Sequence, residues 1–404
     1  MTTIFKGARV FDGERFLDGP HDVIFDGTTI TQVAPAGAVQ LDDAVVVDAG
    51  GKTVTPGFID SHIHSTFSGA SLLEAVMKPF SYQFFEAMRN LRDDLALGIT
   101  TARDAGGGDA GLKQAIAEGI IAGPRLKISV NIMSQTGGHN DGFCPSGVDT
   151  AIAHPGKPSG VADGPDGCRK KARELFRAGA DQIKICTTGG VLSPADSPEH
   201  SQFTVAEIQA IVEEAEAHGS YVLAHAQGTA GIKNALRGGV RSIEHGIFLD
   251  DEAIQLMLDK GAYLVPTLIA PLWVIRLAEA GRPIPQIMVD KSRRVADVHR
   301  NAFARAAAAG VKVAMGTDTG VGPHGTNLEE LWLMYDGGLT LEGTLKATTA
   351  TAAELVAPNE KLGRIAAGYT ADVVLLDYDL TAGEQLKDLP SHVAAVYQGG
   401  KQVI

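Results

Sequence analysis

Short apolar segments alternate with longer amphipathic segments through the middle of the chain. The apolar segments span residues 57–63, 100–105, 125–133, 182–188, 221–227, 242–248, 262–269 and 311–318. Enough chain follows each of them for a helix, and segments 206–219 and 300–310 carry apolar residues at roughly helical spacing and end in glycine. Short apolar strands that alternate with helices are typical of βα units and a parallel sheet.

Eight βα units predict an α/β fold in which the strands close into a (β/α)8 TIM barrel. An open, doubly wound sheet can also hold eight parallel strands, so it remains an alternative. The two ends of the chain differ from this middle, because their short apolar runs are bounded by Gly, Asp and Pro. We therefore expect a composite β-sandwich domain built from residues 1–55 and 356–404, with the barrel over residues 56–355.

Composition and charge narrow the class of protein. Of the 404 residues, 44% are hydrophobic and 21% are charged, which is ordinary for a folded globular chain. The formal net charge of -13 argues against nucleic acid or an anionic membrane as a partner, because both carry negative charge. A small-molecule substrate fits this charge better.

The cysteines and the N-terminal residues bear on location. Cys144, Cys168 and Cys186 show no CxxC spacing and leave an odd residue in any pairing, so we expect no disulfide framework. The first residues lack the pattern of a secretory signal, and no run of about 18 apolar residues occurs. We expect a cytoplasmic protein outside the membrane, and a homo-oligomer, as large barrels often are.

Two histidines lie one residue apart at the end of the first apolar segment, in the stretch GFIDSHIHSTFSG. Residues i and i+2 of a strand point to the same face, so His62 and His64 can reach one metal ion. In a barrel the active site lies at the carboxyl ends of the strands, where this pair would be. Two surface histidines on a loop are the alternative interpretation.

A lysine lies inside an apolar strand pattern, in the stretch DQIKICTTGG. Burying the ammonium group of Lys184 without a partner is costly. A lysine whose head group reaches solvent at the strand end is one explanation. A buried lysine with a lowered pKa is the other, because its amine can react with carbon dioxide to form a carbamate that bridges two cations.

Three further polar residues follow later strands. His225 ends VLAH, His245 ends SIEH, and Asp318 ends VAMGTD. Taken singly, each histidine can be a hydrogen-bonded core residue, and the aspartate can start a turn or cap a helix. Together with the earlier residues they fall at the ends of the first, fourth, fifth, sixth and eighth strands. We therefore expect a metal site at one rim, where Asp318 can also accept a proton from water.

This constellation resembles the amidohydrolase superfamily, and the likeness covers essentially the whole chain. The motifs that carry it are TPGFIDSHIH, GADQIKI, SIEHG, GTDTG and KLGRIAAGYTADVVLLD. The loops TGGHND, TTGGVLSP and PHGTNLEEL look like those of the metal-dependent Xaa-Pro dipeptidase (prolidase-like) and carboxypeptidase group. The resemblance implies a barrel that holds two divalent ions at its rim.

The resemblance also implies roles for single residues. The implied metal ligands are His62, His64 and Asp318 for one ion, His225 and His245 for the other, and carboxylated Lys184 as the bridge between them. A hydroxide held between the ions would attack the amide carbonyl, and Asp318 would pass its proton to the leaving amine. Zinc is the metal we expect, although imidazole and carboxylate ligands suit manganese, iron and cobalt as well.

Three residues in loops are candidates for contact with substrate. His139 in GGHND resembles the family's imidazole that assists the substrate carbonyl, with a solvated loop histidine as the alternative. His324 in GPHGTNLEEL is a further candidate. Trp273 falls in an apolar loop where dipeptide-cleaving relatives often carry a tyrosine, so a bulky or aromatic substrate group would be favoured there.

The sequence therefore predicts a metal-dependent hydrolase that cleaves the amide bond of an Xaa-Pro-like dipeptide or an N-acyl amino acid. Hydrolysis of a carbamate, or of an aromatic amide of the ochratoxin type, by the same metal centre is the alternative. A non-catalytic scaffold with the same fold is the third possibility. It would require lost metal ligands, whereas every ligand position in this chain is occupied.

Overall fold

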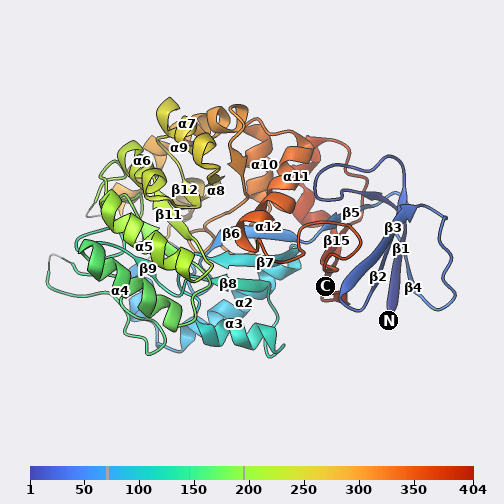
Figure 1. Ribbon diagram of the computed structural model, residues 1–404, viewed down its shortest axis with the longest axis horizontal. Coiled ribbons are helices and arrows are strands. Elements are labelled where there is room, and N and C mark those ends of the chain that lie inside the picture. Colours follow the sequence, from blue (N-terminus) through green and yellow to red (C-terminus); the bar gives the residue numbers. More distant parts are fainter. Residues whose placement is uncertain (70–71, 145, 194–195) are drawn as a thin grey trace.

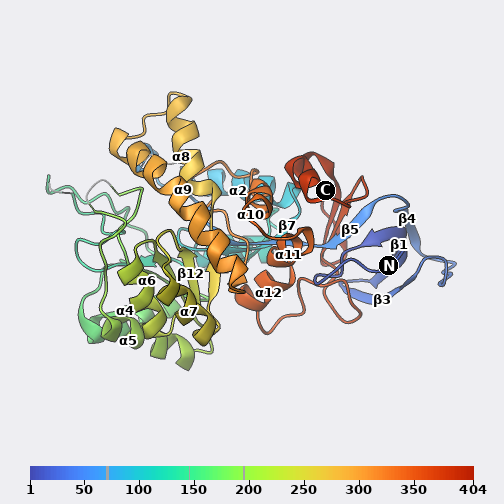
Figure 2. The same ribbon diagram turned by 90° about the horizontal axis from the view of Figure 1, so that it is seen from above.

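The computed structural model describes residues 1–69, 72–144, 146–193 and 196–404. Figure 1 shows a small sheet from both chain ends at one side of the molecule, and a larger assembly of strands and helices at the other. The N- and C-termini lie near each other on the side of the small sheet in both views (Figures 1 and 2). No helix in the described ranges is long and apolar enough to cross a membrane.

The small sheet pairs the two ends of the chain. Its strands are β1 (Thr2–Val10), β2 (His21–Asp26), β3 (Thr29–Pro35), β4 (Val45–Asp48), β5 (Thr53–Pro56), β15 (Val373–Leu376), β16 (Val393–Gln398) and β17 (Lys401–Gln402). They follow the order β17-β16-β15-β5-β1-β2-β3, with β4 beside β1. The rings of Phe5, Phe25 and Tyr397 pack on each other with centroids 5.2 to 5.8 Å apart. Aromatic side chains from both chain ends therefore share one core.

The larger part contains only parallel strand pairs. Its strands are β6 (Phe58–Ile63), β7 (Ile99–Asp104), β8 (Arg125–Ile128), β9 (Ile132–Met133), β10 (Ile183–Cys186), β11 (Val222–Ala226), β12 (Ser242–His245), β13 (Tyr263–Val265) and β14 (Lys312–Val313). They form the orders β6-β7-β8 and β9-β10-β11-β12-β13-β14. A strand lies in each of the eight predicted apolar segments, which confirms the mixed α/β expectation. Most of these strands are buried throughout, as expected when helices cover a parallel sheet.

Backbone hydrogen bonds connect the first strand, β6, to the segment that follows β14. Ser61 N donates to Met315 O at 2.8 Å, and His64 N donates to Thr319 O at 2.7 Å. Asp318 N donates to His62 O at 2.7 Å. Residues more than 250 positions apart in sequence are therefore neighbours at this edge, and the histidine pair lies beside the aspartate.

Helices follow most of the parallel strands. They are α1 (Leu72–Met77), α2 (Tyr82–Ala96), α3 (Ala110–Ala117), α4 (Gly164–Arg177), α5 (Val205–Ala217), α6 (Thr229–Gly238), α7 (Asp251–Lys260), α8 (Ile269–Glu279), α9 (Gln286–Ala308), α10 (Glu329–Asp336), α11 (Leu341–Ala347) and α12 (Ala350–Val356). Two 3-10 turns, Gly383–Lys387 and Leu389–His392, precede β16. Both predicted helices are present, as α5 and as the C-terminal part of α9. Helix α9 begins well before the predicted segment, directly after Pro285, and packs beside α8 (Figure 2).

Candidate metal centre

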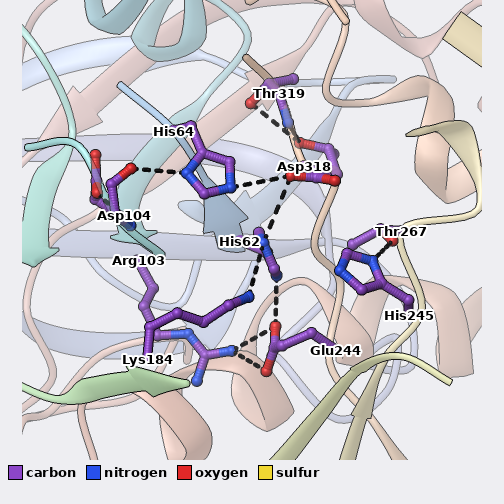
Figure 3. A network of polar contacts seen from close by, with 12 residues as sticks. His62, His64, Arg103, Asp104, Lys184, Glu244, His245, Thr267, Asp318 and Thr319 are labelled. Atoms are coloured by element: carbon purple, nitrogen blue, oxygen red, sulfur yellow. Dashed lines mark hydrogen bonds and ion pairs between the residues drawn. The ribbon is translucent and has the colours of Figure 1, made fainter. Parts of the chain in front are cut away.

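The histidine pair and the aspartate converge on one point. His62 lies on β6 and His64 directly follows it, and their ring centroids are 5.4 Å apart. Asp318 Oδ1 is 3.1 Å from His64 Nε2 and 3.5 Å from His62 Nε2 (Figure 3). One ligand atom from each residue lies within 4.8 Å of the others, so these three side chains could hold a metal ion.

A buried ion pair orients His62 from behind. Glu244 Oε2 is 2.6 Å from His62 Nδ1, and Glu244 Oε1 is 2.9 Å from Arg103 Nη2 (Figure 3). All three side chains are at most 1% exposed. Burial raises the pKa of Glu244, but Arg103 and His62 outweigh it and hold the pKa at about 2. The ionised carboxylate therefore accepts a hydrogen bond from the Nδ1–H group of His62. This leaves the lone pair of His62 on Nε2, the nitrogen that faces Asp318.

The other histidines are oriented in the same way. His64 Nδ1 is 2.7 Å from Gly106 O, and His225 Nε2 is 3.1 Å from Gly189 O. A carbonyl oxygen only accepts, so each of these nitrogens carries the proton and the opposite nitrogen of the ring is free to bind a metal. His245 Nδ1 lies 2.7 Å from Thr267 Oγ1, which leaves its Nε2 as the candidate ligand atom.

Burial keeps the imidazoles of His62, His225 and His245 neutral. It lowers the pKa of His62 to about 4 and the pKa values of His225 and His245 well below the ordinary value. At His64 the contact with Asp318 outweighs burial and raises the pKa. The ring centroids of His225 and His245 are 4.7 Å apart, and those of His62 and His245 are 5.2 Å apart. Because only the neutral imidazole binds a metal, a cluster of buried neutral histidines fits a metal centre.

Lys184 on β10 reaches the same point. Its Nζ lies 3.3 Å from His62 Nε2, and its side chain is buried. No carboxylate of the described residues lies within ion-pair distance of it, and burial lowers the pKa of the Lys184 amine. A buried ammonium beside a neutral histidine, without a counter-charge in contact, is costly.

Two of these positions have a strained backbone. His245 has φ 73° and Asp318 has φ 58°, in the left-handed region that residues with side chains rarely adopt. Each such residue costs about 1 to 3 kcal/mol, and such strain clusters at functional sites. The end of β12 and the segment that follows β14 therefore bear a conformational cost to present these two side chains.

All six predicted metal ligands and His139 line one cavity of about 680 Å³. The His139 ring stacks on the His225 ring with centroids 4.4 Å apart, and His139 Nδ1 is 3.1 Å from Asp196 Oδ2. Apolar side chains line another part of the wall: Leu192, Ile247, Pro271, Val274 and Val321. The cavity therefore combines a polar centre with an apolar surface, as is usual for small-molecule sites.

Two predicted substrate contacts lie elsewhere. Trp273 is part of helix α8 and not of a loop, and it is not among the residues that line the cavity. Its ring lies under Arg276 at 5.1 Å, and its indole Nε1 is buried without a hydrogen-bond partner. His324 Nδ1 pairs with Asp94 Oδ2 at 2.7 Å, and its Nε2 lies 3.3 Å from His64 O. His324 supports the segment that carries His64 and, like Trp273, is not among the residues that line the cavity, so contact of either side chain with substrate stays a prediction.

Three residues that orient the site were not predicted from the sequence. Arg103 and Glu244 are charged residues inside buried strands, at TTARD and SIEH, and that unusual placement was the available signal. Asp196 lies in a loop between β10 and α5, where the sequence pattern carries no such signal.

Comparison with known proteins agrees with this geometry. A model described as the amidohydrolase family matches residues 53–403. An ochratoxinase from Aspergillus niger is 35% identical over 349 residues, which cover 84% of this chain and 69% of the relative. A solved prolidase complexed with N-methylphosphonate-L-proline is 37% identical with a TM-score of 0.90, over 100% of this chain and 99% of that one. A Xaa-Pro dipeptidase with bound methionine is 32% identical, with the same TM-score and coverage.

The matched family and the relatives account for the buried neutral histidines, the unpaired buried lysine and the carboxylate that surround one cavity. These relatives are enzymes, and the group of His62, His64 and Asp318 could hold the metal that such enzymes use. On this evidence the chain belongs to the amidohydrolase family and is a metal-dependent hydrolase of amide bonds.

Proposed function

We propose that this protein is a binuclear metal-dependent hydrolase that cleaves the amide bond of dipeptides or N-acyl amino acids. The observation that carries the proposal is the orientation of the histidine rings. In each ring a group outside the proposed ligand set contacts one nitrogen, which leaves the other nitrogen for a metal. Histidines that only fill a core would not be expected to share this orientation around one cavity.

The donor set divides into two groups. His62, His64 and Asp318 would hold one ion, and His225 and His245 would hold the second. Lys184 would bridge them after its amine forms a bond to the carbon of carbon dioxide and releases a proton, which leaves a carbamate anion. Two observations support this assignment: Lys184 Nζ lies against His62, and no carboxylate of the described residues is within 4 Å of it. Zinc is the metal that we propose.

The scaffold that we propose is a closed (β/α)8 barrel over residues 56–355, with a composite β-sandwich from residues 1–55 and 356–404. The hydrogen bonds from Ser61 and His64 to the segment after β14 support closure, since they join the first strand to the last. We also propose a cytoplasmic, homo-oligomeric enzyme without nucleic-acid or membrane partners, as expected from the charge and the cysteines.

Two ions in this site would lower the pKa of a water molecule and polarise the scissile carbonyl. Asp318 would accept the proton of the attacking water and pass it to the leaving amine. Burial raises the pKa of Asp318, but its contact with His64 and the charge of nearby Lys184 outweigh it, so the carboxylate is ionised and ready to accept. His139, oriented by Asp196, would donate a hydrogen bond to the substrate carbonyl oxygen.

The cavity wall bears on the substrate. Its apolar part, with Pro271, Val274 and Val321, suits a bulky or aromatic group beside the scissile amide. The likeness to an ochratoxinase supports an aromatic amide of that type as a second candidate. The likeness to a prolidase and a Xaa-Pro dipeptidase supports dipeptides. N-acyl amino acids share the amide and the free carboxylate with dipeptides.

Metal removal and a lysine variant test the proposal. We expect a chelator, or the substitution Lys184→Ala, to lower kcat/KM for amide substrates by a factor on the order of 10³ or more, because metal polarisation is worth several kcal/mol. Zinc should restore the treated wild type but not Lys184→Ala. Mass spectrometry should find two metal ions per chain in the wild type and fewer in Lys184→Ala.

Lys78→Ala is the matched control, because Lys78 lines the same cavity but pairs with Glu86 at 2.8 Å. It should keep both metal ions and most of the activity. Undiminished turnover of Xaa-Pro dipeptides, N-acyl amino acids and aromatic amides by a metal-free preparation would overturn the proposal. Side-by-side rates on these three substrates and on carbamates identify the preferred class.

A further inference from the structure

One cation in the cavity has no assigned role. Three lysines line the cavity: Lys184 is at the metal centre, and Lys78 pairs with Glu86. The third is Lys157, in the segment between β9 and α4. No carboxylate within the described residues lies within 4 Å of its Nζ, whose one side-chain hydrogen bond goes to Gly107 O at 3.2 Å. Two of the three donors of this ammonium group are therefore free for a ligand.

The backbone anchors Lys157 close to the metal centre. Gly107 follows Gly106, whose carbonyl oxygen holds His64 Nδ1 at 2.7 Å. Gly107 has φ 127°, and an added Cβ would lie 2.5 Å from Thr66 Oγ1, so this position requires glycine. Lys157 and His64 therefore contact adjacent peptide units of one tightly packed turn, and the cation lies on the His64 side of the cavity.

The nearest acidic groups are engaged elsewhere. Asp104 accepts hydrogen bonds from Gly106 N at 2.8 Å, from Gly108 N at 3.1 Å and from both the backbone and the hydroxyl of Ser65. Asp109 accepts from Leu112 N at 2.8 Å, where it caps helix α3. These carboxylates act on the Lys157 ammonium only from a distance.

The side chain of Lys157 is partly buried. Burial lowers the pKa of Lys157, and the fields of Asp104 and Asp109 offset part of this effect. A partly buried ammonium without a contact ion pair is unfavourable in the empty cavity. An incoming anion would form charge-assisted hydrogen bonds with it, which are roughly twice as strong as neutral ones.

We propose that Lys157 binds the free carboxylate of the amino acid on the leaving-group side of the scissile amide. This inference rests on the proposed function and narrows it: the preferred substrate is an N-acyl amino acid or dipeptide, and an amide without a neighbouring carboxylate is a poor one. The cation also explains how a cavity with an apolar wall can select a charged substrate and orient it against the metal centre.

A matched pair of substrates tests this role. N-benzoyl-L-phenylalanine and N-benzoylphenethylamine differ only in the carboxylate. We expect the wild type to favour the acid by about 10- to 100-fold in kcat/KM, the range of a hydrogen bond to a charged group. Lys157→Met should remove this preference by slowing hydrolysis of the acid alone. Lys78→Met, in the same cavity, should keep the preference.

Binding measurements separate this inference from the proposed function. Calorimetry of N-benzoyl-L-phenylalanine and of N-benzoylphenethylamine on zinc-loaded protein measures the carboxylate preference even if neither amide is cleaved. Absence of cleavage would count against the proposed function alone. If Lys157→Met does not fold, Lys157→Gln gives the same comparison, and so does inhibition of the wild type by L-phenylalanine and by phenethylamine. Equal binding of the acid and the neutral amide by the wild type, or an equal loss for both in the variant, would overturn the inference.

Discussion

At the scale of single residues, the centre depends on groups that do not touch the cavity. Glu244 fixes the ring of His62, and Arg103 fixes Glu244, with every atom of this relay buried. Their charge inside buried strands was a signal in the sequence, but their pairing was not, because the two lie on strands β7 and β12 and meet only in the fold. The place of the histidines and Lys184 beside the cavity was predictable, because each lies in the second half of an apolar segment, directly after it, or at an unusual charged position within it.

We predict that Glu244→Gln lowers zinc affinity by about 10- to 100-fold, since outer hydrogen-bond partners of metal ligands contribute on that scale. A neutral amide can accept from His62 Nδ1 but leaves Arg103 without a counter-charge. Zinc titration of the folded variant, followed by calorimetry, measures the change. Glu354→Gln, which breaks an exposed pair with Lys312, is the control and should bind zinc as the wild type does. An unchanged affinity in Glu244→Gln would contradict the role of this relay.

At the scale of elements, the strands were predictable and the start of helix α8 was not. The eight apolar runs specify buried strands by themselves. The segment with Trp273 was expected to be a loop, but the backbone N–H groups of Leu268 and Ile269 donate to the Glu330 carboxylate, each at 2.8 Å. A carboxylate more than 60 residues away thus accepts hydrogen bonds from the free N–H groups at the start of the helix. No local sequence pattern reveals such a distant partner.

Helix α9 supports the end of β12 through a buried histidine. His299 Nε2 donates to His245 O at 2.9 Å, and burial lowers the pKa of His299 to about 4. The folded protein keeps this ring neutral, whereas the unfolded chain protonates it below about pH 6.5. The unfolded state therefore binds more protons between these values, and stability falls as the pH is lowered from 6.5 to 4.

His299→Gln tests this pH dependence, because glutamine can still donate to the His245 carbonyl but does not titrate. Between pH 6.5 and 4, the unfolding free energy of the variant should depend less steeply on pH than that of the wild type. The slope should be smaller by about 1.4 kcal/mol per pH unit. Urea unfolding of the metal-free proteins at several pH values measures it. The contribution of His62, which shifts in the same direction, stays in both proteins. Identical slopes would show that His299 does not carry the effect.

At the scale of the whole molecule, the chain ends pair with each other away from the cavity. Strand β15 pairs with β5, and Tyr397 on β16 packs against Phe5 and Phe25 of the N-terminal strands. The turn-rich ends were predictable as β structure, whereas the register that joins them depends on aromatic contacts between residues nearly 400 positions apart. This sheet then acts on the metal centre only by holding the scaffold together.

That separation predicts a stability defect without a catalytic one. Tyr397→Ala should lower the free energy of unfolding by about 3 to 5 kcal/mol, because the side chain is 7% exposed and its removal leaves a cavity in an aromatic core. Tyr82→Ala, at 46% exposure, should change it by no more than about 0.5 kcal/mol. Denaturant unfolding measures both variants, and kcat/KM of folded Tyr397→Ala should match the wild type. A large loss of kcat/KM in the folded variant would mean that the terminal sheet shapes the metal centre directly, because lost stability alone leaves the folded molecules as active as before.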